Sequence, residues 1–166
     1  MSKSLLIAAA ALMTAALALA ADLPRTYDPD PREIHFGPVT MLTDGGENAE
    51  AYFSYDSQRL VFQTTREEYP CDQIVMIPAT GGDPELISTG KGRTTCAYFT
   101  GDDSQVIYAS THLAGDECPT PPDMSQGYVW GIFAGYDIFK LDLASHELVP
   151  LTATPGYDAE ATISPD

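Results

Sequence analysis

Side chains able to do chemistry are present in this chain, but their spacing matches no common catalytic motif. The sequence has no Gly-x-Ser-x-Gly nucleophile turn, no His-Glu-x-x-His zinc motif, no P-loop and no dinucleotide fingerprint. Its histidines, His35, His112 and His146, are scattered. Because the chain has 24 acidic residues, the alternative that two carboxylates are spaced for glycoside hydrolysis stays open. We expect no catalytic residue, no metal and no cofactor, and we favour a protein that is not an enzyme.

The N-terminus has the pattern of a secretory signal peptide over residues 1–21. A short start containing Lys3 precedes the apolar run Leu5–Ala20, and small residues surround a cleavage point after Ala20 or Ala21. The run is slightly short for a membrane span of about 20 residues, so a membrane anchor is the less favoured alternative. We expect a periplasmic or secreted protein with no stable membrane span after cleavage.

Cys71, Cys96 and Cys118 are disulfide candidates in such an exported protein, because thiols oxidise outside the cytoplasm. They lack the Cys-x-x-Cys spacing of a zinc site. A catalytic thiol is equally disfavoured, because no histidine stands at a recognisable position to activate it.

A strand-turn phrase that occurs three times is the strongest indication of the fold. Ala51–Asp56 recurs as Ala97–Asp102 and again as Ala161–Asp166. The segment Gln58–Arg66 aligns with Ser104–His112 at the same spacing and without a gap. Repeats of roughly 45 residues that are rich in β-forming residues are typical of propeller blades, which bury their apolar faces only by stacking on neighbours.

Each repeat is expected to form four short antiparallel strands joined by hairpin turns. Aromatic and β-branched residues mark the strands, and polar or glycine-containing runs mark the turns. The expected strands of the first repeat are Ala49–Phe53, Leu60–Thr64, Gln73–Ile77 and Glu85–Ser88. Those of the second are Thr95–Phe99, Gln105–Ser110, Asp137–Leu143 and Glu147–Thr152, and Ala159–Ile163 would open a third blade.

The fold class is therefore all-β: a β-propeller of four-stranded antiparallel blades, with about two blades and the first strand of a third. The blade repeats cover about 42–88, 89–152 and 153–166, and the second carries an insertion at 113–136. Residues 22–41 form an extended lead-in, and a strand at Val39–Leu42 could close onto the last blade. Because a closed ring needs about four to eight blades, we expect an N-terminal fragment of a longer protein.

The charge balance is strongly acidic, with 24 Asp and Glu residues against 8 Lys and Arg and a formal net charge of −16. Nucleic acid is not an expected partner, because its phosphates attract clustered basic residues. Anionic membrane surfaces are disfavoured for the same reason. Acidic loops are explained first by solubility, while binding of a cation or a basic partner stays open.

The topology of a four-stranded blade places the three cysteines on one face of the ring. The connection between its second and third strands emerges on the same face as the connection to the next blade. Cys71 and Cys118 lie in connections of the first kind, and Cys96 ends one of the second kind. We favour a disulfide between Cys71 and Cys96, with Cys96 to Cys118 as the alternative.

Polar and aromatic residues expected on this same face are candidates for binding. The aromatic pair belongs to the insertion and offers contact area, although packing of the insertion onto its own blade is the alternative. The polar residues stand at strand ends and could ring the channel mouth, with ordinary surface or interblade contacts as the alternative. The candidates are Glu50, Arg66, His112, Tyr128, Trp130 and Glu160.

Several of these residues also resemble a known repeat family. Leu151-Thr152, followed by Gly156 and by Ser164–Asp166, looks like the repeat of TolB-type propellers, which are related to WD-repeat proteins. The resemblance covers about residues 42–166, although Tyr55 and Gly101 replace the proline of Ser-Pro-Asp in the first two copies. Further matches are Leu42-Thr43, Ser54–Asp56, Thr64–Arg66, Asp72–Ile74 and Asp137–Phe139.

The resemblance implies an exported, periplasmic scaffold for protein contacts, as TolB-like components of envelope transport complexes are. On this basis we expect a non-catalytic scaffold that binds a protein or peptide partner in the cell envelope. The same repeat precedes the catalytic domain of prolyl-oligopeptidase-type serine hydrolases, so a gating propeller is one alternative. A propeller enzyme with its active site at the channel mouth is another.

Overall fold

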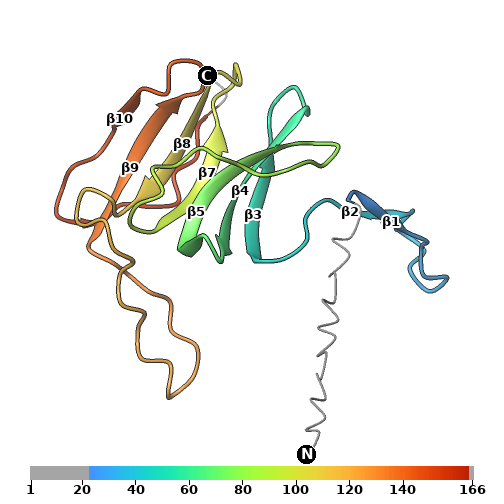
Figure 1. The fold of residues 1–166 in the computed structure, drawn as a ribbon, viewed down its shortest axis with the longest axis horizontal. Helices are drawn as coiled ribbons and strands as arrows, with labels where there is room; N and C mark the ends of the chain where they lie inside the picture. The colour runs from blue at the N-terminus through green and yellow to red at the C-terminus, as the bar shows by residue number, and fades with distance from the viewer. Residues whose placement is uncertain (1–22, 165–166) are drawn as a thin grey trace, which may run out of the picture.

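The computed structural model describes residues 23–164, and all the elements of regular secondary structure among them are β-strands. The expected signal peptide, residues 1–21, lies outside the described residues, as do the last two residues of the third repeat phrase. Two antiparallel sheets, blade 1 and blade 2, stand side by side (Figure 1). Blade 1 consists of β3 (Glu47–Phe53), β4 (Arg59–Arg66), β5 (Tyr69–Pro78) and β6 (Glu85–Leu86). Blade 2 consists of β7 (Thr94–Phe99), β8 (Gln105–Ser110), β9 (Gly135–Asp142) and β10 (Leu148–Pro150).

The first hairpins of the two blades are equivalent in register. Tyr52 in β3 pairs with Val61 in β4, and its repeat equivalent Tyr98 in β7 pairs with Ile107 in β8. In both hairpins the register shifts through a β-bulge just before the tyrosine. The sequence repeat is therefore a structural repeat, and the two sheets are successive blades of a propeller, as the sequence predicts.

The turn that joins the first two strands of each blade is closed by the same side-chain bonds. In blade 1, Ser54 Oγ donates to Asp56 Oδ1 at 2.7 Å and accepts from the backbone N–H of Arg59 at 2.9 Å. In blade 2, Thr100 Oγ1 donates to Asp102 Oδ1 at 2.7 Å. Serine, threonine and aspartate favour such local bonds, so these short polar runs become tight hairpins between apolar strands.

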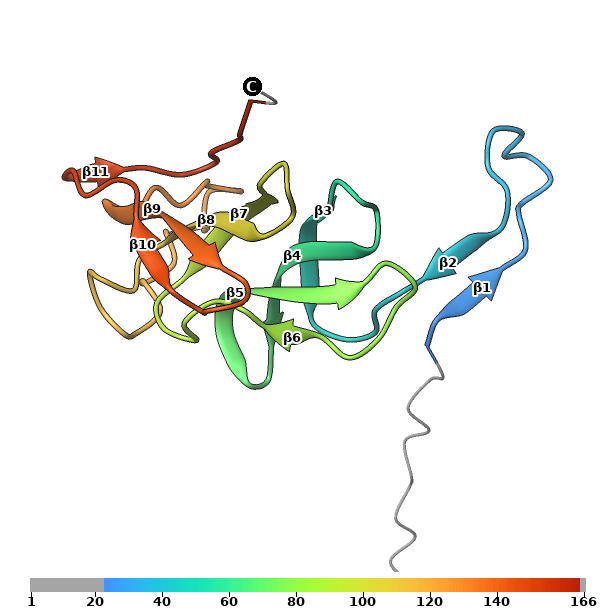
Figure 2. The same ribbon diagram turned by 90° about the horizontal axis from the view of Figure 1, so that it is seen from above.

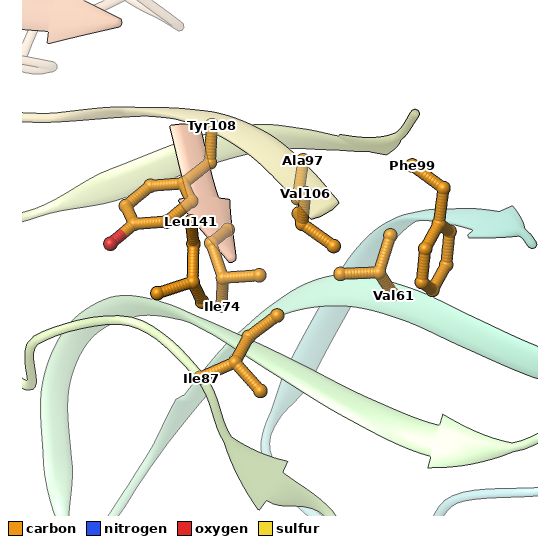
Figure 3. Close-up of a cluster of buried hydrophobic side chains, with 8 residues drawn as sticks. All are labelled: Val61, Ile74, Ile87, Ala97, Phe99, Val106, Tyr108 and Leu141. Carbon is orange, nitrogen blue, oxygen red and sulfur yellow. The ribbon is translucent and has the colours of Figure 1, made fainter. Parts of the chain in front are cut away.

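The main core lies between the blades. Its buried side chains are Val61, Ile74 and Ile87 from blade 1 and Ala97, Phe99, Val106, Tyr108 and Leu141 from blade 2 (Figure 3). Because strand side chains alternate, Leu60 and Phe62 point to the other face of blade 1 and form a second cluster with Val75 and Ile77. Fully burying one aliphatic or aromatic side chain contributes about 1.5–3 kcal/mol, so the interblade core holds the two sheets together.

A polar clamp joins the blades turn to turn. Asp103 Oδ1 accepts from the N–H of Tyr55 at 2.7 Å, and Asp103 Oδ2 accepts from the N–H of Asp56 at 2.8 Å. The Asp103 carbonyl accepts from the guanidinium of Arg59 at 2.7 Å, and that guanidinium lies over the Phe99 ring, 5.2 Å from its centroid. One aspartate of blade 2 thus fixes the position of the blade 1 turn.

The lead-in forms a hairpin of its own. β1 (Arg25–Tyr27) and β2 (Val39–Met41) pair antiparallel and lie outside both blades (Figure 2). The structure thus has a strand where the sequence predicts Val39–Leu42, but this strand pairs with Arg25–Tyr27, a segment for which the sequence predicts an extended lead-in. Closure of β2 onto another blade stays a prediction.

The start of the third repeat differs from the expectation. The predicted strand Ala159–Ile163 is not formed. Instead β11 (Gly156–Tyr157) pairs in parallel with β9, matching Tyr157 with Tyr136. The physical reason is that a strand needs hydrogen bonds to a neighbour, and within residues 23–164 no strand is hydrogen-bonded to 159–163. No helix in this described range is long and apolar enough to cross a membrane.

Candidate binding site at the channel mouth

Each of the three repeats has a residue with a left-handed backbone conformation, and this residue stands at the same position in each repeat. Glu50 and Cys96 each have a φ of 52°, and Glu160 has a φ of 60°. Residues other than glycine seldom adopt this conformation. In β3 and β7 it coincides with the β-bulges, which re-aim one side chain out of the regular alternation. All three side chains line a single pocket of about 440 Å³, which we call the channel pocket.

The β7 strand that carries Cys96 is tied to blade 1 by hydrogen bonds across the blades. Gln63 Oε1, in β4 of blade 1, accepts from Thr95 Oγ1 at 2.8 Å and from the backbone N–H of Cys96 at 3.1 Å. Both donors sit at the bulge of β7. The bond therefore orients the Cys96 backbone so that its side chain faces the pocket.

Aromatic residues form the walls of the channel pocket. Tyr52 and Tyr98 make an edge-to-face pair with ring centroids 5.1 Å apart. Trp130, from the insertion, also lines the pocket, and its indole N–H donates to the Tyr157 hydroxyl at 3.3 Å. Aromatic rings in this arrangement supply large contact area at little cost in side-chain entropy.

The electrostatics of the pocket are negative. Cys96 Sγ donates to Glu50 Oε2 at 3.0 Å, so the thiol is a neutral donor to a carboxylate. Burial, followed by this hydrogen bond to Glu50, raises the pKa of Cys96 to about 12. Partial burial and then the charge of Glu50, with a smaller effect of Glu160, raise the pKa of Tyr52. Both carboxylates thus act on the same small region.

The observed disulfide corrects the favoured pairing. Cys71 bonds to Cys118 with a Cα–Cα distance of 5.9 Å, while Cys96 keeps a free, buried thiol. The prediction of a Cys71–Cys96 disulfide is therefore wrong, and so is the alternative prediction of a Cys96–Cys118 disulfide. The reason is that the bulge turns Cys96 toward the channel pocket, which neither Cys71 nor Cys118 lines. The disulfide fastens the insertion to the start of β5 in blade 1.

The insertion packs partly on its own blade and partly across the channel side. Tyr128 and Trp130 line a second hollow of about 190 Å³ next to the channel pocket, together with Gln63 and Arg93. Phe133 lines the same hollow and also packs back on blade 2, with its ring 6.2 Å from that of Tyr136. The insertion thus packs on its own blade through Phe133, while a binding role for Tyr128 and Trp130 stays a prediction.

The six predicted binding residues are only partly brought together. Glu50, Trp130 and Glu160 share the channel pocket, and Tyr128 lies in the neighbouring hollow beside Trp130. Arg66 and His112 line neither hollow.

Both of the outlying residues are engaged within their own blades. Arg66 donates from Nε to Thr64 Oγ1 at 3.2 Å. The His112 ring lies 4.4 Å from the Phe139 ring, and its Nδ1 is 2.8 Å from Ser110 Oγ. Burial, with Lys91 nearby, lowers the pKa of His112, so the imidazole is neutral at pH 7.

Among the residues that line the channel pocket, sequence reasoning missed Tyr52, Cys96 and Tyr98 as candidates. A signal for Cys96 was available, since the repeat alignment places it at the position of Glu50. The tyrosines were read only as strand formers. Among residues 23–164, no group of three or more His, Cys, Asp or Glu side chains is arranged to hold a metal ion.

These features define a class of protein: a β-propeller with an acidic, aromatic-walled pocket at the first strands of its blades. No protein-family model matches the sequence, and no curated protein matches it either.

Solved structures of TolB proteins share this fold. A protein assigned as TolB from Agrobacterium tumefaciens matches with a TM-score of 0.52 and 17% identity, over 74% of this chain and 39% of that one. TolB from Acinetobacter baumannii matches with a TM-score of 0.49 and 15% identity, over 74% of this chain and 25% of that one. The first of these matches shows that the chain has a TolB-like β-propeller fold, and the chain spans well under two thirds of either structure.

Proposed function

We propose that this chain is an exported, non-catalytic β-propeller that binds a protein or peptide partner at its channel mouth, in the manner of TolB-type envelope components. The observation that carries the proposal is the channel pocket. Equivalent positions of three successive repeats, Glu50, Cys96 and Glu160, converge on it, and Trp130 from the insertion closes one side. A concave site with aromatic walls and a few convergent polar groups suits recognition of a peptide segment.

The state of the reactive side chains supports a non-catalytic role. Cys96 is the free thiol among the described residues, and its raised pKa of about 12 keeps it protonated at neutral pH, whereas a nucleophile must be a thiolate. His112, which could otherwise act as a base, lies outside the pocket with its ring tilted against that of Phe139.

Two features support export to the periplasm or beyond. The first is the signal-peptide pattern of residues 1–21, and the second is the disulfide between Cys71 and Cys118, a bond that forms and persists in oxidising compartments. The TolB-like fold agrees with a place in the cell envelope.

Photo-cross-linking in cells that export the chain tests the proposal. A photoreactive phenylalanine is placed at position 128 or 130, and a matched probe is placed at the exposed Ser145 in the turn between β9 and β10. We expect adducts with a protein or peptide from positions 128 and 130 and none from position 145. No adduct at the channel-side positions, or equal adducts at all three, would contradict the proposal.

A further inference from the structure

The channel pocket has the chemistry to receive an organic cation. We propose that it binds an ammonium or guanidinium group presented by a peptide, a refinement that rests on the proposed peptide-binding function. The acidic composition of the chain is compatible with a basic partner. The pocket indicates where the partner would bind and which chemical group it would present.

Two carboxylates converge on the pocket from different repeats. Glu50 belongs to β3 of blade 1 and Glu160 to the start of the third repeat, and both residues are exposed. Among the described residues that line the pocket there is no Lys, Arg or His. The Cys96 thiol donates to Glu50 at 3.0 Å but carries no charge, so it does not neutralise the site. The pocket therefore holds two negative charges without a resident counter-charge.

The aromatic walls favour an organic cation over a hydrated metal ion. A guanidinium or ammonium group is attracted to ring faces, with tryptophan the strongest, in addition to carboxylates. Trp130 is about half exposed, at 51%, and its hydrogen bond to Tyr157 holds the ring in place. Tyr52 and Tyr98 form a second aromatic wall. Hard metal ions instead need six to eight oxygen ligands, roughly, which this set does not offer.

The effect of the carboxylates on their neighbours agrees with this assignment. Burial is the main cause of the raised pKa of Cys96 and of Tyr52, and the charges of Glu50 and Glu160 raise both pKa values further. The contributions of the two carboxylates, unlike burial itself, favour positive charge at this place. Aromatic walls around that place exclude part of the water and strengthen the attraction.

Trp130 provides a direct readout, because it is the one tryptophan of the 166-residue sequence. The probe is a pentapeptide with blocked ends and a central arginine between alanines and glycines. Its control carries citrulline, which has the shape of arginine without the charge. A third peptide carries citrulline and a free N-terminal amine, and so separates a side-chain cation from a terminal ammonium. Each is titrated up to about 10 mM while Trp130 fluorescence is followed.

We expect the arginine peptide to bind at least about fivefold more tightly than the blocked citrulline peptide, from the worth of one ion pair with a cation–π contact. Glu160→Gln and Glu50→Gln should each weaken binding of the arginine peptide by about fivefold. Glu147→Gln removes the same charge from an exposed turn outside the pocket, and it should change the affinity by less than about twofold.

The outcomes separate the two proposals. Equal affinity for all three peptides overturns the cation assignment but leaves peptide binding at the channel mouth in place. An equal loss in all three glutamine variants also overturns it, because only the overall charge would then matter. No change of Trp130 fluorescence with any peptide overturns both the cation assignment and the proposed peptide-binding function.

Discussion

Removing the Cys71–Cys118 disulfide should destabilise the fold strongly. The two cysteines are 47 residues apart in sequence, so the bond closes a long loop in the unfolded chain. For a loop of this length, the chain-entropy relation of −2.1 − 1.5R ln n cal/mol/K gives about 4 kcal/mol at 25 °C. Domains of this kind have a total stability of roughly 5–15 kcal/mol, so the disulfide accounts for a large share.

The perturbation is the double variant Cys71→Ala with Cys118→Ala. Alanine is chosen because Cys71 is only 1% exposed, and a serine hydroxyl there would be buried. Urea unfolding followed by circular dichroism gives the free energy of unfolding. With a slope of about 2 kcal/mol per molar urea, the midpoint should fall by about 2 M. Reductant should lower the midpoint of the wild type and leave that of the double variant unchanged.

The control is Cys96→Ala, which removes the free thiol and no cross-link. It should cost about 1 kcal/mol, as expected for a small group lost from a largely buried position. A loss below about 1 kcal/mol in the double variant would refute the reasoning, because the cross-link would then not restrict the unfolded chain. Equal losses in the control and the double variant would refute it too.

Three further predictions concern single side chains. Asp103→Asn should cost about 1–2 kcal/mol in urea unfolding, because one of its two acceptors to the blade 1 turn becomes an amide NH₂ group; Ser57→Asn, at the equivalent left-handed position, should be neutral. Cys96 should react with iodoacetamide at pH 8 about a thousandfold more slowly than an ordinary thiol, because its pKa is about 12. Glu50→Gln should speed the reaction. An ordinary rate in the wild type would contradict the assignment of Cys96 as a buried thiol that is hydrogen-bonded to a carboxylate. Hydrogen bonds from Thr100 and Ser104 lower the pKa of Asp102 to about 2 in the folded state, below its unfolded value of roughly 3.9. The stability that Asp102 adds is therefore complete above about pH 4 and is lost as the pH falls toward 2. The difference in unfolding free energy between wild type and Asp102→Asn should shrink across that window, and a constant difference would contradict this prediction.

Blade architecture was predictable because its signals are local and repeated. The polar turns at Ser54–Asp56 and Thr100–Asp102 lie between apolar strands, and the same spacing returns in each repeat. The strand Gln105–Ser110 was predicted with the bounds that the structure has. The strand predicted at Ala159–Ile163 failed because strand formation depends on a partner, and the pattern of one segment contains no information about its neighbour.

The candidate site was predicted less well, because a repeat position indicates a face of the ring and not a direction of the side chain. Arg66 and His112 occupy the expected strand ends but are held by Thr64 and Phe139 within their own blades. Cys96 was grouped with the other cysteines, although its repeat position matched that of Glu50.

By itself, the amino-acid sequence determined the class of fold, the strand order within each blade and the acidic character of the chain, because strand alternation, turn preferences and charge are properties of short segments and of composition. Only the tertiary structure decided that Cys71 bonds to Cys118, that Cys96 faces the channel, and that Trp130 meets Glu50 and Glu160 in one pocket. Those outcomes depend on bulge geometry and on contacts between blades, which bring together side chains that are far apart in sequence.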